Sequence, residues 1–107
     1  MSDFPKQIQD RIDAGMKCGS GISKGWMPLV DELDNALAEL HPDYVIDQIK
    51  EKFGSLRYYV SGVDSSEAHL LINEAECKSQ EICEECGAPG ERRSDRWIRT
   101  LCDECSK

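Results

Sequence analysis

Four of the six cysteines in this chain stand in two pairs whose spacing suits a metal ion. Cys83 and Cys86 form one Cys-x-x-Cys pair, Cys102 and Cys105 form a second, and fifteen residues separate the pairs. Four thiolates in a tetrahedron match zinc, and a site with four protein ligands has no open position for a catalytic water. The spacing therefore predicts one structural zinc site. A redox dithiol pair and an iron–sulfur site are the alternatives for the same residues.

The other two cysteines, Cys18 and Cys77, are predicted to be buried free thiols. A thiol nucleophile needs a base, and the chain has only two histidines. His41 precedes a proline at a predicted helix end, and His69 is expected on a helix surface, so neither is assigned to a thiol. No phosphate-binding or dinucleotide-binding glycine motif occurs in the sequence. We therefore expect a protein that is not an enzyme, with catalysis by Cys18 or Cys77 as a third alternative.

Between the two cysteine pairs, the sequence is locally basic and carries a tryptophan. The candidate partner-binding residues are Arg92, Arg93, Arg96, Trp97 and Arg99. Arginine beside an exposed aromatic ring is a common anchor at protein interfaces, and it also suits phosphates and stacked bases. The alternative is that Trp97 and Ile98 pack this segment onto the rest of the protein, while the arginines are merely solvated.

Length and charge limit the remaining possibilities. A chain of 107 residues allows one small domain. A second, very small module is possible only if it has a stabilising metal ion or disulfide of its own. The formal net charge of -8 argues against a basic groove for nucleic acid along the whole chain. No apolar run approaches the roughly 20 residues that cross a bilayer, and the first residues do not resemble a signal peptide. We expect a cytoplasmic protein without membrane contact, where thiols stay reduced.

Two helices are predicted in the first 40 residues. Residues 5 to 17 repeat apolar side chains every four positions, and the two glycines of the "CGSG" segment at 18 to 21 end that pattern. A clearer amphipathic helix follows Ser23, its candidate cap, and ends before Pro42. Four acidic residues are expected on its solvated face: Asp31, Glu32, Asp34 and Glu39. The alternative for this face is a negative surface that docks on a basic nucleic-acid-binding protein.

A β-hairpin and a third helix are predicted next. Apolar residues alternate on both sides of Gly54-Ser55, the predicted turn, although the first half of the hairpin could instead be helical. Ser65 or Ser66 is expected to cap a helix that runs to about Ser79. The predicted fold class is α+β, with helices packed on a short antiparallel hairpin in residues 1 to 80. A four-cysteine zinc ribbon at 81 to 107 docks on that domain and depends on its metal, because it has few aliphatic residues.

Two resemblances add to this interpretation. The segments "CEECGAPGERR" and "LCDEC" resemble the zinc finger of the DksA/TraR family, which binds RNA polymerase through its secondary channel. This likeness implies that the four paired cysteines are zinc ligands, but the loop is shorter here and a long helical hairpin is absent. More widely, "KGWMPLVDEL", "QIKEKFGSLRYYV" and "CEECGAPG" resemble small phage and prophage proteins. That likeness implies a phage-like origin, in which small acidic proteins bind and inhibit host machinery.

The predicted function is a non-catalytic, zinc-binding protein-interaction module, of the phage inhibitor or adaptor type, that acts on a host protein. The alternative is a transcription regulator that binds nucleic acid or RNA polymerase through the basic ribbon loop. The sequence does not indicate the oligomeric state. It also leaves open whether residues 52 to 59 form a binding face or pack within the sheet.

Overall fold

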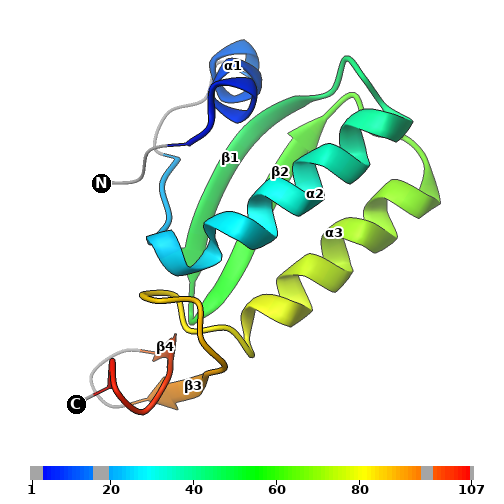
Figure 1. Cartoon of the computed structure of the whole chain (residues 1–107). Coiled ribbons are helices and arrows are strands. Elements are labelled where there is room, and N and C mark those ends of the chain that lie inside the picture. Colours follow the sequence, from blue (N-terminus) through cyan, green and yellow to red (C-terminus); the bar gives the residue numbers. More distant parts are fainter. Residues whose placement is uncertain (1–3, 16–19, 95–97, 107) are drawn as a thin grey trace.

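The computed structural model describes residues 4–15, 20–94 and 98–106, and it confirms the α+β fold class. Figure 1 shows helices packed on an antiparallel hairpin, with a small ribbon at the C-terminal end. In chain order the elements are α1 (Lys6–Gly15), the short 3-10 helix η1 (Lys24–Trp26), α2 (Met27–Leu40), β1 (Val45–Lys52), β2 (Ser55–Ser61), α3 (Ser66–Ser79), β3 (Glu91–Ser94) and β4 (Ile98–Leu101).

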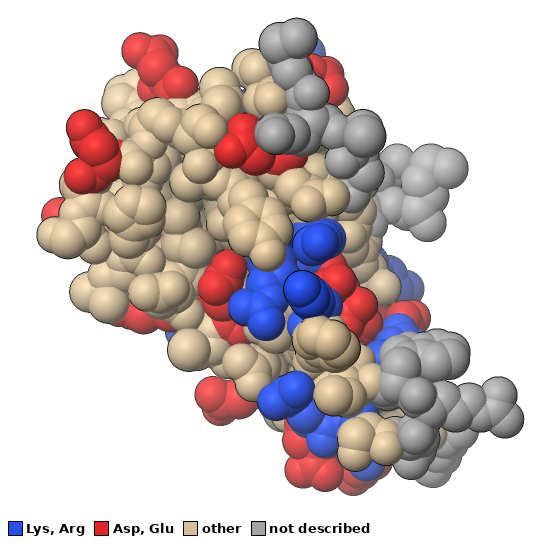
Figure 2. Space-filling view, turned by 180° about the vertical axis from the view of Figure 1, so that it is seen from behind, with Lys and Arg blue, Asp and Glu red and all other residues tan. Residues whose placement is uncertain are grey.

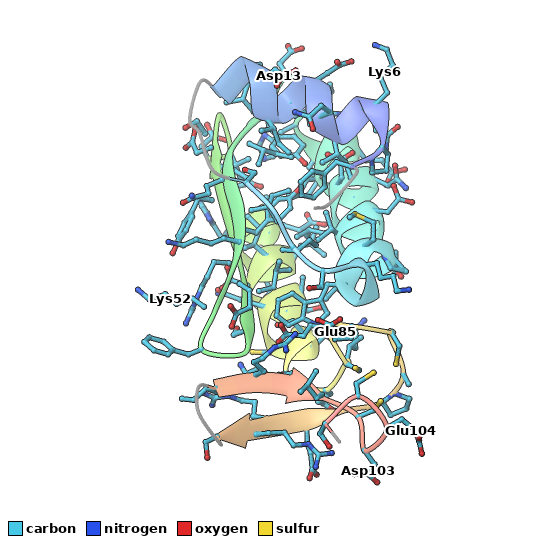
Figure 3. All side chains as sticks on the ribbon, turned by 90° about the vertical axis from the view of Figure 1, so that its left-hand side faces the viewer. Lys6, Asp13, Lys52, Glu85, Asp103 and Glu104 are labelled. Carbon is cyan, nitrogen blue, oxygen red and sulfur yellow. The ribbon has the colours of Figure 1, made fainter. Side chains whose placement is uncertain are left out.

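The core lies between the hairpin and the helices that cover it. Helices α2 and α3 run side by side across one face of β1 and β2, and α1 packs along β1 (Figure 1). The fully buried side chains between these layers include Trp26, Leu37, Ile46, Ile49 and Leu56. The β3–β4 ribbon lies at the end where the hairpin turns, and α1 lies toward the opposite end (Figure 3).

Of the two predicted helix caps, one is confirmed and the other is wrong. The Ser65 hydroxyl accepts a hydrogen bond of 3.2 Å from the Ala68 amide, so the predicted cap of α3 is confirmed. The Ser23 side chain makes no capping bond, because η1 intervenes before α2 begins. The Ser23 hydroxyl instead lies 3.5 Å from a carboxylate oxygen of Glu85, in the ribbon. Ser23 therefore faces the ribbon rather than the helix it precedes.

The hairpin turn lies one residue earlier than predicted. Lys52 pairs with Ser55, so the two turn residues are Phe53 and Gly54, with φ of 54° and 78°. Two consecutive left-handed residues form the tight turn that matches strand twist, and glycine suits the second position. Phe53 consequently leaves the buried alternation, and its side chain is 58% exposed.

Both edges of the hairpin have hydrogen-bonding groups that are already satisfied within the chain. On β2, the Leu56 amide donates to the Ser79 hydroxyl at 2.8 Å, and the Tyr58 amide donates to a Glu76 carboxylate oxygen at 3.1 Å. On β1, the Ile49 amide donates to the Ser20 hydroxyl, and the Ile49 carbonyl accepts from the Gly21 amide. Unpaired edge groups attract further strands, so these contacts close the edges at those positions.

Asp34 is fully buried, so its predicted position on the solvated face of α2 is wrong. Its carboxylate accepts hydrogen bonds from Arg11 at 2.8 Å, from Gln7 at 3.1 Å and from the Tyr44 hydroxyl. Burial raises the pKa of both Tyr44 and Tyr58, whose hydroxyls lie 2.8 Å apart, so both stay protonated. The prediction failed because side chains of α1 reach the Asp34 carboxylate, and the periodicity of one helix does not show which side chains of another element contact it.

Removing the Arg11 guanidinium should test how strongly this buried carboxylate holds α1. Arg11→Met leaves the Asp34 charge without its cation, so we expect the free energy of unfolding to fall by about 3 kcal/mol in urea titrations. The control is Lys6→Gln, which breaks the exposed Lys6–Asp10 pair and should change the free energy by less than about 0.5 kcal/mol. Equal effects of the two variants would contradict a buried, stabilising Asp34 contact.

Candidate metal centre

The four paired cysteines converge on one point of the ribbon. The Sγ atoms of Cys83, Cys86, Cys102 and Cys105 all lie within 4.8 Å of one another. The Cys86 and Cys102 sulfurs are 3.6 Å apart, and none of the four forms a disulfide. Metal–sulfur bonds of about 2.3 Å place the sulfurs of a tetrahedral site about 3.8 Å apart. The cluster could therefore hold a single metal ion with only small adjustments.

The backbone around the first pair turns tightly enough to aim both sulfurs inward. The Gly87 amide donates to the Cys83 carbonyl at 2.9 Å, and the Cys83 amide donates to the Ala88 carbonyl at 2.7 Å. Gly87 has a φ of 85°, which glycine adopts without steric strain. In the second pair, the Cys105 amide donates to the Cys102 sulfur at 3.4 Å. These local bonds shape both turns around the sulfurs.

The chemistry of the thiols fits a cation at this position. Burial raises the pKa of Cys83, but amide donors of Cys102, Cys86 and Glu85 outweigh that effect and lower it to about 6. The pKa of Cys105 is raised to about 12. The largest cause is its hydrogen bond to Cys102, and hydrogen bonds to Cys83 and Cys86 add to this effect. Thiols that share protons in this way ionise together only when a cation balances their charge, and metal binding requires the thiolate forms.

The ribbon is attached to the domain through Gly25 and Trp26. The Gly25 amide donates to the Glu84 carbonyl at 2.9 Å, and the buried Trp26 indole donates to the Ile82 carbonyl at 2.9 Å. A Cβ on Gly25 would lie 2.1 Å from the Cys83 carbonyl oxygen. Only glycine lets η1 approach the first cysteine turn so closely.

The hairpin turn forms the second attachment. The buried Thr100 hydroxyl donates to the Gly54 carbonyl at 2.5 Å, and Arg92 donates to the Phe53 carbonyl at 3.1 Å. On the hairpin side, the Gly54 amide donates to the Glu51 carboxylate at 2.7 Å. A Cβ on Gly54 would lie 3.2 Å from backbone of Arg99, so the two turns pack backbone to backbone.

Two predicted partner-binding arginines form ion pairs inside the ribbon. Arg99 bonds to Glu85 and, at 3.3 Å, to Glu84, whose other oxygen accepts from the Thr100 amide at 3.0 Å. Arg93 donates to Asp103 at 2.8 Å and to the Leu101 carbonyl at 3.1 Å. These contacts tie the first cysteine turn and the second cysteine turn to the strands between them. Burial raises the pKa of the Glu84 carboxyl.

The other predicted site residues are dispersed. Arg92 is exposed beside the hairpin turn, whereas Arg96, Trp97 and Cys18 lie outside the described residues. Cys77 is exposed on α3, so its predicted burial is wrong. The His41 ring lies 2.9 Å from the Ser65 hydroxyl and links the end of α2 to the start of α3. His69 is exposed on α3.

Sequence reasoning missed the residues that attach the ribbon to the domain. Glu84 and Thr100 are buried polar residues, and no spacing rule points to them. Gly25 and Gly54 were visible in the segments "KGW" and "KFG", but a sequence does not show which backbone will approach a glycine. A tryptophan directly after a glycine, in "KGW", was the available signal for close packing.

Adding one methyl group to Gly25 should loosen the ribbon without touching a cysteine. Gly25→Ala is expected to lower the free energy of unfolding by about 1–3 kcal/mol, because the Cβ overlaps the Cys83 carbonyl. The Trp26 indole proton should then exchange with solvent faster in NMR spectra. The matched control is Gly21→Ala, whose Cβ would meet no atom within 4 Å. Unchanged indole exchange in Gly25→Ala would contradict the proposed attachment.

Metal content should separate the four clustered cysteines from the exposed one. We expect one metal ion per wild-type chain and a loss of most bound metal in Cys102→Ser, because a hydroxyl replaces one thiolate ligand. Cys77→Ser should keep the full content. Elemental mass spectrometry of the purified proteins measures both. Full metal content in Cys102→Ser would exclude the four-cysteine site.

No family model matches the chain, and no curated protein or solved structure matches it. Among the described residues, no helix is long and apolar enough to cross a membrane. The features of the chain that bear on its function are its cysteine cluster, the contacts of its ribbon and the charges on its surface.

Proposed function

We propose that the chain is a non-catalytic zinc-binding module that acts by binding another protein, as an inhibitor or adaptor. The observation that carries this proposal is that the sulfurs of all four clustered cysteines lie close enough together to hold one ion within the ribbon. An ion held by four protein ligands stabilises structure and has no position left for a substrate or water. The metal centre would then serve to present a surface rather than to carry out a reaction.

Zinc is the ion that suits this donor set. Four sulfur ligands in a tetrahedral arrangement favour zinc over magnesium or calcium, which take oxygen ligands. An iron–sulfur centre also uses four cysteines, but zinc needs only the single central position that the sulfur separations allow. A reducing compartment such as the cytoplasm keeps these thiols available, and we place the protein there.

The proposed partner surface is assigned to the basic segment between the two cysteine pairs. Arg93 and Arg99 have roles within the ribbon, so contact with a partner is assigned to Arg92, Arg96 and Trp97. Arginine and tryptophan are among the residues that contribute most to protein interfaces. The phage-like resemblance supports a host protein as the target. Binding of nucleic acid or RNA polymerase through the same loop is the competing outcome.

Capture from a bacterial lysate, with and without nuclease, tests this function. Wild type should retain one host protein after nuclease treatment, and Trp97→Ala should lose it while still binding one zinc ion per chain. Leu70→Ala removes an exposed apolar side chain from α3 and should capture the protein as wild type does. Capture that disappears both with nuclease and in Trp97→Ala would favour the nucleic-acid alternative at the ribbon loop. Capture that Trp97→Ala leaves unchanged would remove the ribbon loop as the binding surface.

A further inference from the structure

One face of the hairpin combines unpaired cations with exposed aromatic rings. It is turned away from α2 and α3, and Figure 3 shows Lys52 pointing outward there. Lys50 stands opposite Arg57 in the β1–β2 register, and Gln48 stands opposite Tyr59, so their side chains share this face. We call it the basic hairpin face and define it by Lys50, Lys52, Phe53, Arg57, Tyr59 and Arg92.

Figure 2 shows Lys and Arg side chains gathered over the hairpin and continuing toward the ribbon, with acidic side chains around them. No described acid lies within ion-pair distance of Lys50, Lys52, Arg57 or Arg92. This arrangement is unusual in a chain with 21 acidic and 13 basic residues, where a cation readily finds a carboxylate. The cations of this face are therefore available to an external anion.

Two details show that this arrangement does not serve folding. Like charges directly opposite each other in a hairpin are destabilising, and Lys50 stands directly opposite Arg57. The Arg57 Nε atom is also buried without a hydrogen-bond partner among the described residues. A buried donor without an acceptor is unfavourable, so this position of Arg57 lowers the stability of the fold.

Folding does not explain the exposed aromatic rings of this face either. Phe53 has a left-handed backbone, with φ of 54°, which is unfavourable for a bulky residue, yet its ring is 58% exposed. Neither turn formation nor burial explains phenylalanine at this position, since asparagine before glycine is the preferred pair in such turns. The Tyr59 ring is 44% exposed. Lys50 and Lys52 lie 6.0 and 5.8 Å from the Tyr59 and Phe53 ring centres.

We propose that the basic hairpin face binds single-stranded nucleic acid, a second binding activity beyond the protein-binding function proposed above. Unpaired bases stack on Phe53 and Tyr59, and the cations contact the phosphates. Aromatic rings beside positive charges on an open surface bind single strands in this way, with little dependence on sequence. The surrounding acids and the net charge of -8 confine the strand to this face.

An acidic peptide is the other anion that could meet these cations, but the structure favours it less. Extended peptides usually bind a sheet by pairing with a free edge. The amides of Leu56, Tyr58 and Ile49 already have acceptors from α3 and from Ser20. A ligand must therefore be recognised through side chains on the face, and stacked bases use the two exposed rings.

Fluorescence anisotropy tests the proposal with the metal-loaded full chain and a labelled, mixed-sequence DNA strand of about 20 nucleotides. At about 50 mM salt, we expect saturable binding that is at least about tenfold tighter for the single strand than for its duplex. Four phosphate contacts predict a slope of about -3 in a plot of log affinity against log salt concentration. The lysate capture described above does not depend on this result, so either proposal can fail without the other.

The decisive variant is Phe53→Asn, which places the preferred asparagine–glycine pair in the turn. It should unfold at the same or a higher temperature than wild type and bind the strand about tenfold more weakly. Tyr59→Thr keeps a strand-forming residue and should weaken binding similarly. Arg57→Gln should weaken binding and make the salt slope less steep. Lys78→Gln removes an exposed cation from α3 and should bind as wild type does.

Three results would overturn the proposal. The first is no anisotropy change up to about 100 µM protein, where weak non-specific binding would be visible. The second is unchanged affinity in both Phe53→Asn and Tyr59→Thr, which would exclude stacking. The third is poly-glutamate binding as tightly as the DNA strand, which would point to an acidic protein as the ligand.

Discussion

The constraint on which the structure depends is that the ribbon has too little apolar material to fold by itself. Between Cys83 and Cys105, Ile98 and Leu101 are the only leucine, isoleucine or valine residues. A structural metal bound to four thiolates contributes on the order of 10 kcal/mol to the folding of such modules. A metal ion held by the four cysteines would therefore take the place of a hydrophobic core in the ribbon.

The rest of the domain is adapted to receive this ribbon. Gly25 lets η1 approach the first cysteine turn, and the Trp26 indole bonds to the carbonyl just before it. At the hairpin, the left-handed turn of Phe53 and Gly54 exposes two carbonyls that accept bonds from Arg92 and Thr100. The same turn presents the Phe53 ring to solvent. The turn of Phe53 and Gly54 therefore links the attachment of the ribbon to the exposed ring of the basic hairpin face.

Much of this arrangement could be predicted from local patterns in the sequence. Apolar periodicity located three helices, alternation located the hairpin, and the cysteine spacing identified the four clustered residues. The errors concern contacts between segments far apart in the chain. Asp34 looked solvated because its partner Arg11 lies on another helix, and the turn shifted by one residue because Phe53 adopts a backbone that glycine normally takes. Burial of Glu84 and Thr100 likewise depends on strands that meet only after folding.

The most direct test of the metal's central role is hydrogen exchange before and after complete removal of the metal with a chelator. We expect the amides of residues 83 to 94 and 98 to 106 to lose their protection, while those of α2, α3 and the β1–β2 hairpin remain protected by the hydrophobic core. Protection that persists throughout residues 83 to 94 and 98 to 106 without metal would contradict this expectation, because the ribbon would then be held by something other than its four cysteines.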